Sequence, residues 1–285
     1  MIQKTIGRFY QTQGQNKNYI QKVLLTIAIV FCASILTYNV TTLIFWYIDS
    51  KNIVEEVAEV EEIVGSTEIE DEGELINPPV EEESDYWYYI KLPFTDVDIT
   101  ELKKINADTV GFLSVAGTNI NYPVVQTRDN EYYLNHTFKR QRNSAGWVFM
   151  DYRNNSDFSD QNTVIYGHSR LDVTMFGTLK NILSSAWINN KANYVIRYSS
   201  ESENMLFQVF SVYTIPVESY YIQTNFSSSD KYKQWLDTMV GRSKYNFNAS
   251  VNEGDKILTL STCDNTGNKR IVMQAKLIKK NAKSM

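Results

Sequence analysis

The chain has 285 residues, which suffices for one sizeable domain with appended segments. Two cysteines cannot form a disulfide framework, and we expect both Cys32 and Cys263 to be free. The sequence has no CxxC or HExxH motif and no cluster of histidines and cysteines. These absences argue against a zinc site.

The net charge of −5 at pH 7 describes none of the parts of the chain. Residues 1–22 carry four basic side chains and no acid, whereas residues 50–86 carry fourteen acids against one lysine. Residues 87–285 carry 23 Lys and Arg against 18 Asp and Glu, a net of +5. The main folded part is therefore mildly basic, which is only weak evidence for an anionic partner.

Residues 23–48 are predicted to form a transmembrane helix. No charge interrupts them, and about 20 apolar residues suffice to cross a bilayer. Trp46 and Tyr47 are placed to hold the outer end in the lipid interface. Basic residues precede the segment and acids follow it, which predicts a cytoplasmic tail over 1–22 and an extracellular location for the rest. A cleaved signal peptide is the alternative, but its apolar region usually has only about 7–15 residues.

Residues 49–86 are predicted to be an acidic linker outside the membrane. Apolar residues recur at helical spacing from Ile53 to Val64, which allows a short helix next to the membrane. Beyond Gly65 the segment is rich in Glu and contains Pro78 and Pro79, so we expect it to be extended and mobile.

Residues 87–285 are predicted to form a mainly β domain, an eight-stranded β-barrel with a few peripheral helices. Short apolar runs separated by turn signals predict closure of the sheet. The expected strands are 110–115, 120–125, 146–150, 163–166, 192–198, 205–215, 256–260 and 271–278. The expected helices are 98–104, 175–183 and 229–240, with Ser229 or Asp230 capping the last.

The end of this chain holds a candidate site for thiol chemistry. Cys263 follows the alternating apolar run 256–260 and precedes a polar turn. Arg270 opens the next predicted strand, and a hairpin between the two strands would bring this cation close to the sulfur. His168 follows a third predicted strand. Cysteine, histidine and arginine at strand ends make a candidate site for acyl transfer through a thiol.

These motifs resemble those of the sortase family. The match consists of Thr-Leu-Ser-Thr-Cys over 259–263, the downstream Arg270, and Gly-His over 167–168. The blocks 132–136 and 145–154, and the long helix-containing segment between His168 and Cys263, resemble class B sortases in particular. The resemblance covers about residues 95–280, and the spacing from Cys263 to Arg270 is shorter than in many class B members.

The resemblance implies roles for individual residues. Cys263 would be the nucleophile, His168 the general acid and base, and Arg270 the group that holds the substrate backbone and stabilises the oxyanion. A further set would line the groove for the substrate, with the last two residues in a loop over it: Asn130, Leu134, Tyr166, Ser261, Thr262, Asp264, Tyr221 and Ile222.

Each assignment has a structural alternative. A lone cysteine is by default a buried core thiol, and His136 competes with His168 as the only other histidine. Arg270 could be a solvated hairpin charge like the adjacent Lys269. Leu134 and Tyr166 could be ordinary core residues.

The resemblance implies a cysteine transpeptidase of a Gram-positive bacterium. It would cleave a C-terminal sorting signal of the NPxTx kind after threonine and join the surface protein to a peptidoglycan amine. No metal, organic cofactor or nucleic acid is implied. The alternatives are a signal peptidase or pilin polymerase on the same scaffold, and a non-catalytic barrel that binds the wall. The exact signal, the acceptor, the client proteins and the oligomeric state stay open.

Overall fold

The computed structural model describes residues 2–81, 84–263 and 268–283. The chain divides into two compact units, Met1–Asp49 and Ser50–Met285. The first unit is part of helix α1 (Ile2–Ile63), whose last turns, from Ser50 on, belong to the second unit. Between Tyr19 and Ile63 this helix contains a stretch that is apolar and long enough, by length and composition, to cross a membrane.

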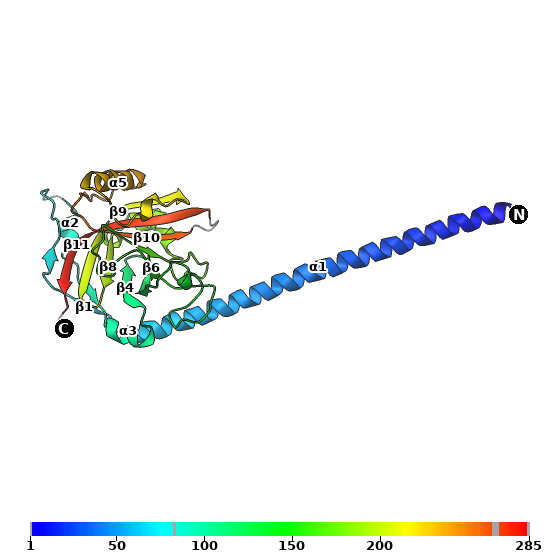
Figure 1. Ribbon diagram of the computed structural model, residues 1–285, viewed down its shortest axis with the longest axis horizontal. Helices are drawn as coiled ribbons and strands as arrows, with labels where there is room; N and C mark the ends of the chain where they lie inside the picture. The colour runs from blue at the N-terminus through cyan, green and yellow to red at the C-terminus, as the bar shows by residue number, and fades with distance from the viewer. Residues whose placement is uncertain (1, 82–83, 264–267, 284–285) are drawn as a thin grey trace. The chain divides into compact units, whose positions relative to one another are not determined.

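The second unit contains a closed β-barrel (Figure 1). Its strands neighbour one another in the order β10-β7-β6-β5-β4-β8-β9-β11, and a pairing of β10 with β11 closes the ring. This confirms the predicted eight-stranded barrel. The strands are β4 Thr109–Val115, β5 Asn121–Val125, β6 Phe149–Met150, β7 Asn162–Tyr166, β8 Val195–Ser199, β9 Glu203–Pro216, β10 Ile257–Cys263 and β11 Lys269–Ala282.

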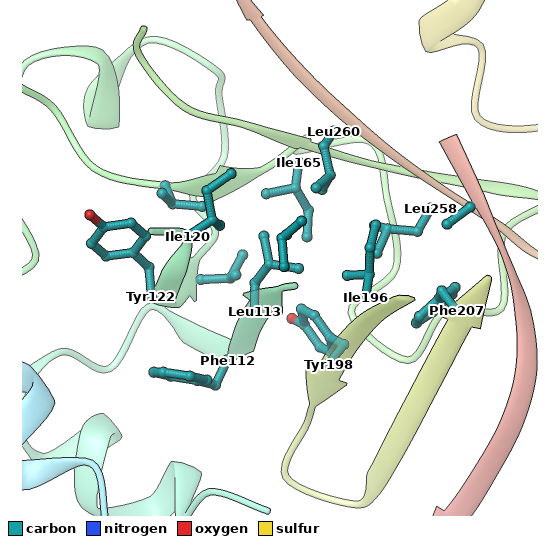
Figure 2. Close-up of a cluster of buried hydrophobic side chains, with 14 of the residues drawn as sticks. Phe112, Leu113, Ile120, Tyr122, Ile165, Ile196, Tyr198, Phe207, Leu258 and Leu260 are labelled. Atoms are coloured by element: carbon teal, nitrogen blue, oxygen red, sulfur yellow. The ribbon is translucent and has the colours of Figure 1, made fainter. Parts of the chain in front are cut away.

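The barrel closes around side chains that alternate along its strands. Figure 2 shows Leu113, Ile165, Ile196 and Leu260 gathered in its interior, each from a different strand. All four are fully buried. Because successive side chains of a strand point to opposite faces, this apolar alternation fixes the register of each strand.

The helices lie around the barrel, and two of the three predicted from the sequence are present. Helix α3 (Ile99–Ile105) begins after Asp98, whose carboxylate accepts hydrogen bonds from the next turn. Helix α5 (Ser229–Arg242) is capped by Ser228, so the predicted cap at Ser229 or Asp230 was placed one or two residues too late in the chain. The shorter helices are α2 Tyr86–Tyr89, α4 Ser185–Ile188, η1 Tyr132–Leu134, η2 Leu179–Leu183, η3 Lys191–Asn193 and η4 Tyr220–Ile222.

The helix predicted over 175–183 is mostly absent. Only η2 forms, as a 3-10 helix at the C-terminal end of that range. Met175 has a φ of 52° and is buried, and its backbone N–H donates to the hydroxyl of Tyr122. A helix cannot include a residue in this left-handed conformation, so packing of Met175 overrides the local helical pattern.

The linker follows its prediction only in part: the expected helix near the membrane is present as the end of α1, which runs to Ile63. The last turns of α1 belong to the second unit, and their Ile53 and Val60 are buried in its core. Beyond Gly65, β1 (Thr67–Ile69) pairs with β3 (Phe94–Asp96), and β2 (Glu74–Leu75) extends the barrel sheet beside β11. The segment is therefore not an extended, mobile stalk at these strands, and the compact unit begins at Ser50 rather than near residue 87.

This packing predicts that Ile53→Ala destabilises the second unit. Loss of a fully buried isoleucine side chain costs about 2–5 kcal/mol, and Ile53 belongs to the main core cluster. The matched control is Val54→Ala, because Val54 is 49% exposed one position along the same helix. Denaturant unfolding of the full chain in detergent micelles measures both. Equal effects of the two substitutions would contradict the packing of the linker.

Candidate active site

A groove of about 290 Å³ opens at one edge of the barrel, and nine of the residues predicted to form the site line it. These nine are Asn130, Leu134, Tyr166, His168, Tyr221, Ile222, Ser261, Thr262 and Arg270. Four lining residues were not predicted: Phe149, Gly167, Val217 and Glu218. The exposed surface of the wall is mainly apolar, as is usual for a ligand pocket, although eight of the thirteen lining residues carry a polar side chain.

Strand pairing explains why residues distant in sequence meet here. β10 runs parallel to β7, and Ser261 lies beside Tyr166 in the register. Parallel strands end at the same edge of a sheet, so His168, two residues beyond Tyr166, and Cys263, two residues beyond Ser261, leave the sheet together. In the antiparallel pairing of β10 with β11, Cys263 lies directly opposite Arg270. Directly opposite residues in such a pair have Cα atoms about 4.5–5.5 Å apart.

The predicted hairpin is thus present, but two predicted features fall outside the described part of the chain. Nothing is described of Asp264 or of the side chain of Cys263. The backbone of Cys263 is described as the last residue of β10.

His168 is held by one ring nitrogen. Its Nε2 is 2.8 Å from the carbonyl oxygen of Leu134. A carbonyl oxygen can only accept a hydrogen bond, so Nε2 carries a proton and donates it. The other ring nitrogen, Nδ1, is therefore the one that can gain or lose a proton in a reaction. On the backbone side, the N–H of Phe176 donates to the carbonyl of His168 at 3.0 Å.

A glycine makes room for this imidazole. Gly146 has a φ of 61°, and a Cβ at this position would lie 2.4 Å from the carbonyl oxygen of Tyr133 and 3.0 Å from Cδ2 of His168. The chain can pass here only without a side chain. Gly146 belongs to the 145–154 block, so the block shapes the histidine site.

His136 occupies a different environment. Its ring stacks on Tyr132 with centroids 4.0 Å apart, and its Nδ1 is bonded to the carbonyl of the same residue at 2.7 Å. It does not line the groove.

A buried carboxylate supports one wall of the groove. Asp151 accepts a hydrogen bond from the hydroxyl of Tyr166 at 2.9 Å and a bidentate pair of bonds from Arg153. Arg153 also donates to the carbonyl of Ile222 at 3.0 Å. Burial alone would raise the pKa of Asp151, but the hydrogen bonds from Arg153 and Tyr166 outweigh it and leave this pKa lowered. The ionised carboxylate therefore joins the end of β7 to the η4 loop.

Sequence reasoning named the block that contains Asp151 and Arg153 but gave neither residue a role. The signal was available, since a carboxylate and an arginine two residues apart directly after a strand suggest a charged turn. Val217 and Glu218 had no such signal. They follow β9, and Glu218 is oriented by an ion pair with Arg242 at 2.6 Å.

Hydrogen bonds also position other lining residues. The hydroxyls of Tyr221 and Ser261 are 2.9 Å apart, and the side-chain oxygen of Asn130 accepts from the backbone N–H of Tyr152 at 3.0 Å. Leu134 is 41% exposed. Leu134 is therefore not the ordinary core residue of the structural alternative, and an apolar group of a ligand could cover its side chain.

Within the described residues, no three His, Cys, Asp or Glu side chains are grouped as metal ligands. The chemistry available in the groove is that of an imidazole, a guanidinium and polar side chains on apolar walls.

Comparison with known proteins agrees with this geometry. The family model described as the sortase domain matches residues 113–278, which is more than half of the chain. The chain belongs to the sortase family. Members of this family are cysteine transpeptidases.

Its relatives are sortases of class B. Sortase B of Listeria monocytogenes is 38% identical over 186 residues, which are 64% of this chain and 75% of that protein. Sortase B of Staphylococcus aureus is 38% identical over 181 residues, covering 62% of this chain and 73% of that protein.

Solved structures give the same result. The crystal structure of sortase B from Bacillus anthracis in complex with AAEK1 matches with a TM-score of 0.66 and 33% identity over 82% of this chain and 99% of that one. The X-ray structure of sortase B from Clostridium perfringens matches with a TM-score of 0.60 and 36% identity over 64% of this chain and 100% of that one.

The crowding at Gly146 predicts that Gly146→Ala displaces His168. A left-handed conformation costs a non-glycine residue about 1–2 kcal/mol, and the added methyl group would contact the imidazole. We expect lower stability and shifted NMR resonances of the His168 ring. Gly241→Ala is the control, because a Cβ there meets no atom within 4 Å. Unchanged His168 resonances in Gly146→Ala would refute this account of the histidine site.

Proposed function

We propose that this sortase cleaves a C-terminal sorting signal of the NPxTx kind after threonine and joins the released surface protein to a peptidoglycan amine. The observation that carries the proposal is the convergence of nine family-predicted residues on one groove, beside the backbone pair of Cys263 and Arg270. The relatives include a sortase B–substrate complex from Staphylococcus aureus, 38% identical to this chain. The groove of this chain would hold its signal in the same way.

In the first half of the reaction, the thiolate of Cys263 attacks the carbonyl carbon of threonine. A tetrahedral intermediate forms and then collapses, breaking the bond from carbon to the leaving nitrogen. His168 gives that nitrogen a proton, and a thioester remains on the sulfur. The donating atom is Nδ1, because Nε2 is bonded to Leu134.

In the second half, an amine of peptidoglycan attacks the thioester carbon. His168 takes a proton from the attacking nitrogen at Nδ1, and the sulfur leaves as thiolate. One new amide bond replaces the one that was cleaved, so no redox partner or metal enters the balance.

Arg270 would stabilise the negative oxygen of both tetrahedral intermediates. Its position opposite Cys263 across the hairpin puts a permanent cation close to the reacting carbon. A guanidinium presents several donors in one plane, so it can hold the oxyanion and a backbone carbonyl of the signal together.

Residues 23–48 would hold the enzyme in the membrane as a single span. Residues 1–22 would then be cytoplasmic and the second unit extracellular, as the basic and acidic flanks of the span indicate. This location gives the groove access both to exported proteins and to wall precursors.

We expect Cys263→Ala to abolish labelling by a thiol-reactive mimic of the sorting signal, because the mimic requires the nucleophile. Cys32→Ala is the matched control and should label like the wild type, since Cys32 lies in the apolar helix. Mass spectrometry of the labelled chain measures both. Equal labelling of Cys263→Ala and wild type would end the catalytic assignment.

The products of the wild-type reaction test the acceptor. With a signal peptide and a wall-stem peptide, an amide adduct is the expected product, and hydrolysed peptide alone would indicate a peptidase instead.

Arg270→Ala should lower kcat for the signal peptide by about 10²–10³-fold, the value of one oxyanion donor. The fold should be retained, because Arg270 is only half-buried at the start of β11. Lys269→Ala is the control at the adjacent, exposed position and should stay close to the wild-type rate. A comparable loss in Lys269→Ala, with near-normal turnover of Arg270→Ala, would move the role to the lysine.

A further inference from the structure

The loop that follows His168 exposes apolar side chains that the proposed reaction does not use. Leu171 is 74% exposed and Val173 is 42% exposed. Neither residue lines the groove. Single exposed apolar residues are common on protein surfaces, so exposure by itself identifies no partner. The construction of the loop and its attachment to the chain supply the further evidence.

A dense polar network holds this loop in shape. The guanidinium of Arg170 donates to both carboxylate oxygens of Asp172 and to the hydroxyl of Thr174. The backbone N–H and hydroxyl of Thr174 also donate to Asp172. The Arg170 and Asp172 side chains are mostly buried, with 9% and 14% exposed. These hydrogen bonds fix the shape of the loop. The charged side chains lie inside it, and the apolar side chains of Leu171 and Val173 lie on its outer surface.

The backbone of the loop is strained in a way that favours this presentation. Val173 has a φ of 60°. This left-handed conformation is unusual for any residue with a side chain and is a marked outlier for a β-branched one. Such strain persists only where the surroundings enforce it, and it is concentrated at functional segments.

The network also joins the loop to the start of the second unit. Nη2 of Arg170 donates to the hydroxyl of Ser50 at 2.7 Å. Ser50 follows Ile48, the last residue of the uncharged apolar segment, by two positions. In a helix this is a rise of only about 3 Å. If residues 23–48 span the bilayer, Arg170 is bonded to a residue at the level of the lipid headgroups, and the loop cannot lie far from them.

We propose that Leu171 and Val173 form a membrane-contact loop that inserts into the headgroup region of the bilayer holding residues 23–48. The proposal rests on the proposed membrane span. The partner is a lipid surface rather than a protein because the contact to Ser50 ties the loop to the end of that span. Apolar side chains on a rigid loop gain free energy by burial at the boundary of headgroups and acyl chains. The contact would orient the groove, since His168 is only three residues from Leu171.

Fluorescence of the full chain in vesicles tests this contact. Leu171→Cys is made in a background of Cys32→Ser and Cys263→Ala, labelled with an environment-sensitive dye, and reconstituted into phosphatidylcholine and phosphatidylglycerol vesicles. Val240→Cys is the matched control, because Val240 is 43% exposed on helix α5, a different part of the second unit (Figure 1). Thermal unfolding verifies that both labelled chains are folded.

The expected result is a blue-shifted dye at position 171 that nitroxide-labelled lipids quench and aqueous acrylamide does not. The dye at position 240 should show the reverse. Quenching of position 171 by acrylamide alone overturns the proposal. Shielding from both quenchers also overturns it, because the loop is then covered by protein, such as a second copy of the chain.

Extraction with alkaline carbonate separates this test from the proposed span. A chain that resists extraction while position 171 stays in water keeps its anchor and refutes only the membrane-contact loop. A chain that is extracted has no span, and both proposals fail together.

Discussion

The parallel pairing of β7 with β10 is the constraint on which the groove depends. It is one of only two parallel pairings in the described barrel, the other being the short contact of β5 with β6. An antiparallel neighbour would place the residues after Tyr166 at the opposite edge from those after Ser261. With the parallel pairing, His168 and Cys263 leave the sheet at one edge, and the return of the chain in β11 brings Arg270 to the same place. The backbone topology thus brings three sequence-distant segments together.

The walls of the groove then depend on two polar residues that lie behind the lining residues. Asp151 and Arg153 tie the hydroxyl of Tyr166 to the backbone of η4. The carboxylate is fully buried, so removal of its arginine partner would leave an uncompensated buried charge, which typically costs more than the pair itself contributes. The pair fixes the position of the η4 loop relative to β7, and with it the width of the groove.

The strands of the barrel and the motif residues of the site could be predicted from the sequence, whereas features set by contacts between distant residues could not. Alternation of apolar residues identifies the strands because burial on one face imposes a period of two, and the motif residues mark the strand ends. Met175 shows the limit of such patterns, since its left-handed backbone depends on packing against Tyr122, which is distant in sequence. Glu218 shows another limit. Nothing near it in sequence distinguishes it from a surface carboxylate, and only the fold brings Arg242 beside it.

The prediction of an extended, mobile linker was wrong for a related reason, because the many acids of this segment predict a solvated chain. Yet Ile53 and Val60 enter the core on one helix face, and a few well-placed apolar residues outweigh the average charge of the segment.

Leu134 links the recognition of a ligand to the proposed proton transfer. Its exposed side chain lines the groove, while its carbonyl oxygen accepts the hydrogen bond that fixes Nε2 of His168. A ligand that presses on the side chain therefore acts on the same short η1 segment that orients the imidazole. The space beside the ring is narrow, since a Cβ at Gly146 would lie only 3.0 Å from Cδ2 of His168, so the imidazole has little room to follow a large displacement of Leu134. A signal that fits the groove would leave Nδ1 aligned, and one that displaces Leu134 would turn it away. Selectivity would then appear in kcat as well as in binding, since the residue proposed to contact the signal also holds the proposed base.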